Sequence, residues 1–239
     1  MPHAQQHRGA HPEDRHLFTL RSSGVLRLAC EEAAWLLDRG YTPNSVIDVV
    51  GRRHQLHARQ RMALQRSMCS TNARQSRKNK QIGVAEIRDA TLLIDGFNLI
   101  IGLEVALSGG LLLRGADGAL RDLAGLRGSY HPVEETDVAL ALLGEILDGL
   151  GTKATRFYLD SPVSNSGKLK ARIIERARGW KQNAEVELVA NPDRLLKNQF
   201  CVVSSDSVVL DEAGSWFNLL DFAVSSKIGT AWILELGVD

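Results

Sequence analysis

Near its middle, the chain reads Leu92-Leu93-Ile94-Asp95-Gly96-Phe97-Asn98-Leu99. The apolar residues predict a buried β-strand that ends in a carboxylate, with a glycine and an asparagine directly after it. In an open α/β sheet, side chains at the carboxyl ends of the strands point into the crevice where ligands bind. We therefore expect Asp95 and Asn98 to hold a hard cation or a phosphate-bound water. The alternative is that Asp95 only caps a helix that follows the strand.

From residue 90 onward, strand-like and helix-like segments alternate along the sequence. Short apolar runs predict strands at 91–94, 155–159, 186–189, 201–204 and 231–236, and a strand or hairpin arm at 111–113. Amphipathic periodicity predicts helices at 134–149, 168–179 and 213–225. Strands that alternate with helices indicate a mainly parallel sheet with helices on both faces.

The sequence before residue 82 predicts a different organisation. Residues 1–21 are polar and rich in histidine, which predicts a disordered tail. Residues 22–81 predict a small basic helical domain and linker, followed by the α/β domain at 82–239. The helices expected within the N-terminal domain lie at 22–39, 43–51 and 58–68.

Composition limits the class of protein. The chain has 239 residues, and the 44% that are apolar suffice for a sizeable core. Its three cysteines, Cys30, Cys69 and Cys201, have no zinc-binding spacing, and an odd, sparse set favours a reducing compartment over a disulfide scaffold. No segment approaches the ~20 apolar residues of a membrane helix, and the N-terminus lacks the apolar core of a signal peptide. We expect a cytoplasmic protein with no membrane partner.

The formal net charge of +1 conceals a basic segment. Residues 51–89 carry ten Lys and Arg against two Asp and Glu, whereas residues 90–239 carry fourteen against twenty. Basic side chains neutralise backbone phosphates without regard to base sequence, so we expect a nucleic-acid partner. The alternative is that residues 70–81 form only a solvated linker. The side chains expected to contact the phosphates are Arg52, Arg53, Arg74 and Arg77.

Three further aspartates occur in settings similar to that of Asp95. Asp160 ends a predicted strand, Asp206 follows another, and Asp137 lies one turn inside a predicted helix. Clustered carboxylates repel one another, and a divalent cation relieves that repulsion. With a cation bound, such a cluster can activate water and stabilise charge on a phosphoryl group. For the acidic residues at 134–137, a favourable position at a helix start is the alternative.

The run Ser164-Asn165-Ser166-Gly167-Lys168 follows Asp160 and opens a predicted helix. Backbone N–H groups at a helix start can bind a phosphate, and Lys168 adds positive charge. The run is not a P-loop, because it lacks the first glycine and has Leu169 where Ser or Thr would bind magnesium. The residues expected to contact a phosphate here are Ser164, Asn165, Ser166 and Lys168.

These motifs resemble those of the PIN-like nucleases, including their NYN branch, over about residues 90–225. Asp95-Gly96-Phe97-Asn98 matches a D-G-x-N motif, and Thr136-Asp137-Val138-Ala139-Leu140-Ala141 matches a T/V-D-V-A-L-A pattern. Ser204-Ser205-Asp206-Ser207 matches S-x-D-x-D/E in part, because Val208 stands at the position of the second acid. The whole chain, with its basic helical N-terminal part, also resembles a prokaryotic family of unknown function, the DUF434 type.

The PIN-like resemblance implies a Rossmann-like fold and a metal-dependent ribonuclease or related phosphodiesterase. One or two Mg²⁺ or Mn²⁺ ions would activate water for in-line attack on a phosphodiester, with Asn98 fixing Asp95 or contacting the substrate. Two alternatives stay open: a non-catalytic nucleic-acid-binding regulator, favoured by Val208, and a metal-dependent phosphatase or small-nucleotide hydrolase. The residues implied as both catalytic groups and metal ligands are Asp95, Asp137, Asp160 and Asp206.

Overall fold

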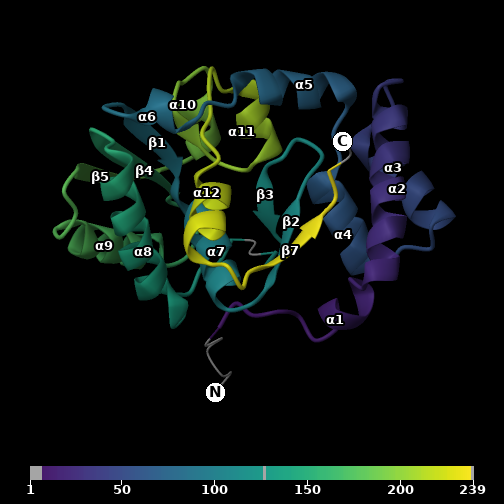
Figure 1. Ribbon diagram of the computed structural model, residues 1–239, viewed down its shortest axis with the longest axis horizontal. Coiled ribbons are helices and arrows are strands. Elements are labelled where there is room, and N and C mark those ends of the chain that lie inside the picture. Colours follow the sequence, from purple (N-terminus) through teal and green to yellow (C-terminus); the bar gives the residue numbers. More distant parts are fainter. Residues whose placement is uncertain (1–6, 126–127, 238–239) are drawn as a thin grey trace.

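The computed structural model describes residues 7–125 and 128–237, which form two β-sheets surrounded by helices (Figure 1). The larger sheet has the order β5-β4-β1-β6, and all of its pairings are parallel. Because the four strands run the same way, their carboxyl ends lie along one edge. The predicted parallel sheet is thus confirmed. Its strands are β1 (Thr91–Asp95), β4 (Ala154–Asp160), β5 (Asn183–Val189) and β6 (Val202–Val203).

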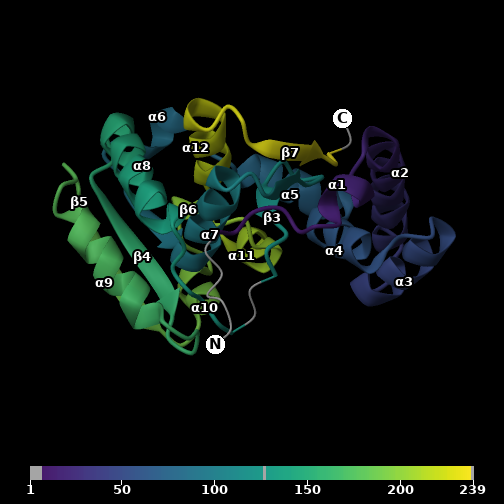
Figure 2. The same ribbon diagram turned by 90° about the horizontal axis from the view of Figure 1, so that it is seen from below.

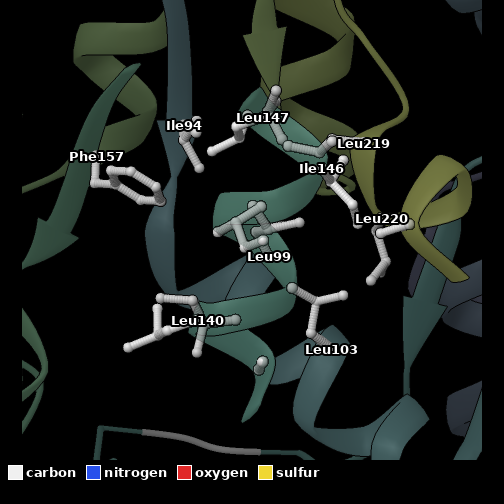
Figure 3. Packing of buried hydrophobic residues seen from close by; sticks show 14 of the residues in the cluster. Ile94, Leu99, Leu103, Leu140, Ile146, Leu147, Phe157, Leu219 and Leu220 are labelled. Atoms are coloured by element: carbon white, nitrogen blue, oxygen red, sulfur yellow. The ribbon is translucent and has the colours of Figure 1, made fainter. Parts of the chain in front are cut away.

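Both faces of this sheet are buried, and the alternation of side chains along β1 shows how. Ile94 points into the main core, where it packs with Phe157 and Leu99 (Figure 3). Leu93 belongs to a second cluster on the opposite face, which includes the fully buried Trp216. Since successive side chains of a strand point to opposite faces, a continuous apolar run fits a strand covered on both sides.

Helices pack on both faces of the sheet and contribute side chains to both clusters. Those in the main core are α7 (Gly96–Leu107), α8 (Glu135–Leu150), α9 (Ser166–Ala177) and α12 (Leu219–Lys227). Those in the cluster on the opposite face are α10 (Pro192–Leu196) and α11 (Ser207–Glu212). The helix predicted at 213–225 begins only at Leu219, because Trp216 instead forms extended bridges to Gln81 and Val202.

The smaller sheet has the order β3-β2-β7 and is mixed. Strand β2 (Leu111–Arg114) pairs antiparallel with β3 (Leu120–Asp122) and parallel with β7 (Trp232–Glu235). The strands predicted at 111–113 and 231–236 are therefore present. They form a sheet of their own and do not extend the parallel one, and β3 was not predicted.

Helices α1 to α4 gather at one end of the molecule, beside the smaller sheet (Figure 2). Leu26, Val46 and Leu64 of these helices share one hydrophobic cluster with Leu113 of β2 and Leu234 of β7. The helical region predicted at 22–81 thus packs directly on the α/β part. Its helices are α2 (Leu20–Leu37), α3 (Pro43–Arg53), α4 (Ala58–Ser67) and α5 (Thr71–Lys80). Two short helices, α1 (Asp14–Leu17) and α6 (Val84–Ile87), flank them.

Two predictions about the N-terminal region were wrong for the described residues. Residues 7–20 are not a disordered tail, because the buried Arg8 forms an ion pair with the fully buried Glu104 of α7. Residues 71–80 are not a linker but helix α5, which Ser70 caps by accepting a hydrogen bond from Ala73 N at 3.1 Å. Residues 1–6 of the predicted tail lie outside the described residues. No helix within the described ranges is long and apolar enough to span a membrane.

Candidate functional site

Three strand-end aspartates converge at one edge of the parallel sheet. Asp95 ends β1, Asp160 ends β4, and Asp206 follows β6. Since β4 and β6 are the two neighbours of β1, the three carboxylates come together, as the sheet rule predicts. All three line a pocket of about 630 Å³ together with Asn98 and Asp193. We call it the acidic pocket.

Asp95 is the most deeply placed of these groups, with a relative exposure of 8%. Burial raises the pKa of its carboxyl to about 7, and the charges of Asp206 and Asp160 act in the same direction. Hydrogen bonds from Ser204 Oγ (2.9 Å) and Asn98 N (3.4 Å) oppose the rise. The bond from Asn98 N also caps α7, so the capping interpretation is confirmed and coexists with a place in the pocket.

Hydrogen bonds fix the loop after β6 to the start of α7. Asn98 Oδ1 accepts from Ser205 N at 2.8 Å and from Ser205 Oγ at 2.9 Å. Ser204 Oγ, which donates to Asp95, also accepts from Asp206 N at 3.0 Å. Asp206 in turn caps α11 by accepting from Val208 N at 2.8 Å. The asparagine of the D-G-x-N motif therefore positions the segment that carries Asp206.

Sequence reasoning missed Asp193, a further carboxylate of the pocket. It lies in the first turn of α10, directly after β5, where Asn191 caps the helix and Pro192 starts it. Burial raises the pKa of Asp193, and the charges of Asp206, Asp160 and Glu212 raise it further. Burial also raises the pKa of Asp160. The available sequence signal for Asp193 was a predicted strand followed by Asn191-Pro192-Asp193. This pattern predicts a turn and the start of a helix, so it does not by itself indicate a site.

The remaining wall of the acidic pocket comes from distant parts of the chain. Helix α4 and the β2–β3 hairpin supply both cations of this wall, Arg66 and Arg121. Arg121 is already engaged, because it donates to both oxygens of Asp117 (2.8 and 2.6 Å) and to Ser205 O (2.7 Å). The other lining residues are Met62, Gln65, Phe97, Ile101, Asp122, Gly125, Ser207 and Val208.

Arg77 was predicted to contact phosphates, but the structure buries it. Its guanidinium donates to Asp117 (2.7 Å) and to both oxygens of Asp211 (2.7 and 2.8 Å). Burial alone would raise the pKa of Asp117, but hydrogen bonds and charges of Arg121 and Arg77 outweigh it and lower the pKa to about 2. Arg77 therefore joins α5 to α11 and to the hairpin, with no exposed charge left for a phosphate.

Asp137 does not join the other three aspartates. It lies on α8, outside the acidic pocket, with its carboxylate 3.4 Å from Arg172 and 3.3 Å from Arg176 of α9. Asp137 lies in the first turn of α8, and its side chain faces the neighbouring helix α9 rather than the strand ends. The structure thus corrects the predicted grouping of four aspartates to Asp95, Asp160 and Asp206, with Asp193 added.

The segment 164–168 also lies outside the lining of the acidic pocket. Asn165, with a φ of 63°, donates from its side chain to Tyr130 O at 2.7 Å. Ser166 is buried, whereas Ser164 and Lys168 are exposed. The side chains of Asn165 and Ser166 therefore hydrogen-bond within the neighbouring loops. The predicted phosphate contact at this helix start is not part of the acidic pocket.

The remaining predicted phosphate contacts are spread over two helices. Arg52 and Arg53 are exposed on α3, and Arg53 pairs with Glu32 at 3.0 Å. Arg74 of α5 lines a different cavity, of about 940 Å³, together with Lys78. None of these three arginines lines the acidic pocket.

Comparison with known proteins places the chain in a family. Residues 84–221 match the family described as a domain of unknown function, DUF5616. The chain belongs to this family. Residues 25–80 match a family described as a protein of unknown function, DUF434, which confirms that resemblance for the N-terminal helices. The chain is 34% identical over 182 residues to an uncharacterized protein of Methanocaldococcus jannaschii, and the match covers 76% of this chain and 87% of that protein. No solved structure matches the chain.

The acidic pocket of this DUF5616 chain draws on both matched regions. Its aspartates lie within residues 84–221, whereas Met62, Gln65 and Arg66 lie within residues 25–80. The two regions are therefore parts of one site as well as of one hydrophobic core.

The oxygen ligands of the acidic pocket suit a hard cation. Across residues 7–125 and 128–237, no three His, Cys, Asp or Glu side chains form a ready cation site. Mg²⁺ does not require such a site, because it keeps several waters and is usually bound by one or two carboxylates and by substrate phosphates. Asp95 and Asp206, joined through Ser204, are the pair that fits this mode, since the charge of Asp206 raises the pKa of Asp95 and a cation would offset that repulsion.

Proposed function

We propose that the chain is a divalent-cation-dependent phosphodiesterase that cleaves RNA in the acidic pocket. The observation that carries the proposal is the convergence of Asp95, Asp160 and Asp206 from three adjacent parallel strands on one pocket. It agrees with the activity implied by the PIN-like resemblance at Asp95-Gly96-Phe97-Asn98. Asp193 offers a further carboxylate where the third motif lacks its second acid at Val208.

The residues of the acidic pocket take distinct roles in this proposal. Asp95 and Asp206 would hold Mg²⁺ or Mn²⁺, which supplies charge stabilisation at the phosphoryl group and lowers the pKa of water. Asn98 and Ser204 keep these two carboxylates in place through the hydrogen bonds described above. Asp160 and Asp193, whose pKa values are raised, would accept a proton from water in this proposal.

Cleavage of a fluorescently labelled single-stranded RNA tests the proposal. Wild type is expected to cleave with Mg²⁺ or Mn²⁺ and not with EDTA, and Asp95→Asn is expected to lose about 100-fold or more in rate. Asp137→Asn is the matched control, because it removes the same charge outside the pocket and is expected to retain activity. Salt-sensitive RNA binding without turnover would replace the proposal by the non-catalytic regulator. Equal loss in both variants would mean that the pocket is not the site.

A further inference from the structure

Helix α4 presents one face to the acidic pocket. Met62, Gln65 and Arg66 line it, at a spacing of three and four residues that places side chains on the same side of a helix. This helix belongs to the N-terminal region and not to the sheet that carries the aspartates. It therefore adds a wall whose chemistry differs from that of the strand ends.

The structure holds α4 firmly. His57 and Gln60 form a reciprocal cap at its N-terminus, and Gln60 Nε2 donates to Leu17 O at 2.7 Å. Ala63 and Leu64, between the pocket-lining residues, are fully buried. A side chain that α4 presents is thus carried by a packed helix, which gives a more precise position than a loop would.

The two cations of the acidic pocket differ in availability. The Arg121 side chain is 7% exposed and bound to Asp117, whereas the Arg66 side chain is 35% exposed. Within the described ranges, the Arg66 guanidinium makes one hydrogen bond, from Nη1 to Asp122 O at 2.7 Å. Since a guanidinium has five N–H donors, most of its capacity stays open toward the pocket.

The nearest carboxylate does not neutralise Arg66 by direct hydrogen bonding. Asp122 Oδ1 lies 3.7 Å from Arg66 Nη1 and instead accepts from Ala124 N at 2.7 Å. Arg66 is therefore a half-exposed cation beside a pocket whose other charged walls are mostly aspartates. A phosphate entering this pocket is repelled by the aspartates and attracted by a bound cation and by Arg66, because Arg121 is already paired with Asp117.

We propose that Arg66 is a substrate-binding residue that holds a phosphate of the nucleic-acid chain through a bidentate pair of hydrogen bonds. The guanidinium fork matches two oxygens of a phosphate, and such charge-assisted pairs are among the strongest that side chains form. The N-terminal helices then serve as the substrate-holding wall of the acidic pocket. The inference rests on the proposed function for the identity of the ligand.

The test measures binding apart from cleavage. A labelled single-stranded hexaribonucleotide is titrated with each variant in EDTA and, in the Asp95→Asn background, in Mg²⁺. Arg66→Gln is expected to weaken binding about tenfold or more, with a smaller slope of log Kd against log salt. Arg66→Lys, which keeps the charge but not the fork, should fall between Arg66→Gln and wild type. Arg21→Gln, the same charge change at an exposed position of α2, should stay within about twofold.

The outcomes separate the two proposals. Arg66-dependent binding without turnover in the wild type would sink the phosphodiesterase and keep Arg66 as a phosphate ligand. Turnover by the wild type, with the same RNA affinity in folded Arg66→Gln or Arg66→Lys, would keep the phosphodiesterase and overturn Arg66 as a phosphate ligand. In the cleaving protein, Arg66→Gln is expected to raise KM with little change in kcat. An equal loss in Arg21→Gln, or no binding by the wild type, would overturn the assignment of Arg66.

Discussion

Ser204 Oγ donates a 2.9 Å hydrogen bond to the buried carboxylate of Asp95. This bond lowers the pKa of Asp95, although burial outweighs it and leaves the pKa at about 7. The same hydroxyl accepts from Asp206 N, so one side chain sets both the charge of Asp95 and the position of Asp206. A neutral neighbour therefore favours the ionised form of the central carboxylate, against the larger effect of burial.

Ser204→Ala is expected to move the acid limb of the pH–rate profile to higher pH. Removal of a donor to the charged form raises the pKa of Asp95 further, so a larger fraction of the protein is protonated and inactive near neutral pH. Rates of RNA cleavage measured from pH 5 to about 9 check this. Ser207→Ala, also in the pocket lining, is the control and should leave the limb in place. A lower rate at every pH with the limb unmoved would assign Ser204 a purely structural role.

Asp95→Asn is expected to stabilise the cation-free protein at pH 8. The pKa of Asp95 is about 7 in the folded chain and about 4 in the unfolded chain, so the folded state binds the proton more tightly. The resulting stability is full below about pH 4 and is lost as the pH rises through 7. At pH 8, neutral Asn avoids the cost of a buried charge, a gain of at most about 4 kcal/mol.

Thermal unfolding at pH 5 and at pH 8 measures this effect. The melting temperature of Asp95→Asn should exceed that of wild type at pH 8 by several degrees and approach it at pH 5. Mg²⁺ should stabilise wild type at pH 8 more than the variant, because a cation offsets the repulsion among the carboxylates. A variant less stable than wild type at pH 8 would contradict the raised pKa.

The strand-end aspartates could be predicted from sequence because their signal is local. An apolar run that ends in Asp identifies Asp95 and Asp160, and an apolar run followed by Ser-Ser-Asp identifies Asp206. Their convergence depends on the strand order, in which β1 lies between β4 and β6, and no local pattern in the sequence shows that order. Asp137 matches the sequence motif, but in the structure its carboxylate pairs with arginines of α9 and does not reach the acidic pocket. A motif match alone therefore does not place a side chain in the site.

Polar segments were the part that sequence could not assign. Arg8 and Arg77 occur in hydrophilic stretches, so Arg8 was expected to belong to a disordered tail, and Arg77 to contact phosphates or to belong to a solvated linker. Each is instead buried and forms an ion pair with a carboxylate distant in sequence, Glu104 for Arg8 and Asp211 for Arg77. A buried ion pair produces no hydrophobic periodicity in the sequence, so composition alone predicts that its residues are exposed.

Arg77→Met is expected to destabilise the chain by about 3–5 kcal/mol, because it leaves the buried Asp117 with one of its two arginines. The pKa of Asp117 is depressed to about 2, so the stability it contributes is present above about pH 4 and lost as the pH falls toward 2. Urea unfolding at pH 7 measures the loss. The exposed neighbour Lys78→Met is the control, and similar small effects of both substitutions would show that Arg77 is not a structural residue.

Gly96→Ala is expected to cost about 1–3 kcal/mol and to lower activity, because there is no room for a side chain between Asp95 and Asn98. A Cβ at this position would lie 2.6 Å from Leu159 Cδ2 and 3.2 Å from the backbone oxygen of Tyr158, so the start of α7 would have to shift. The shift would move Asp95 and Asn98 away from the loop after β6. Urea unfolding and RNA cleavage measure the two effects.

Gly149→Ala in α8 is the matched control for Gly96→Ala. Nothing lies within 4 Å of a Cβ at Gly149, and alanine favours the helix, so the substitution should stabilise by about 0.4–1 kcal/mol with unchanged cleavage. If Gly96→Ala behaved in the same way, the close approach of α7 to β4 would be unnecessary for the acidic pocket. Packing would then not explain why a glycine stands in the D-G-x-N motif, and the geometry of Asp95 and Asn98 would depend on their hydrogen bonds alone.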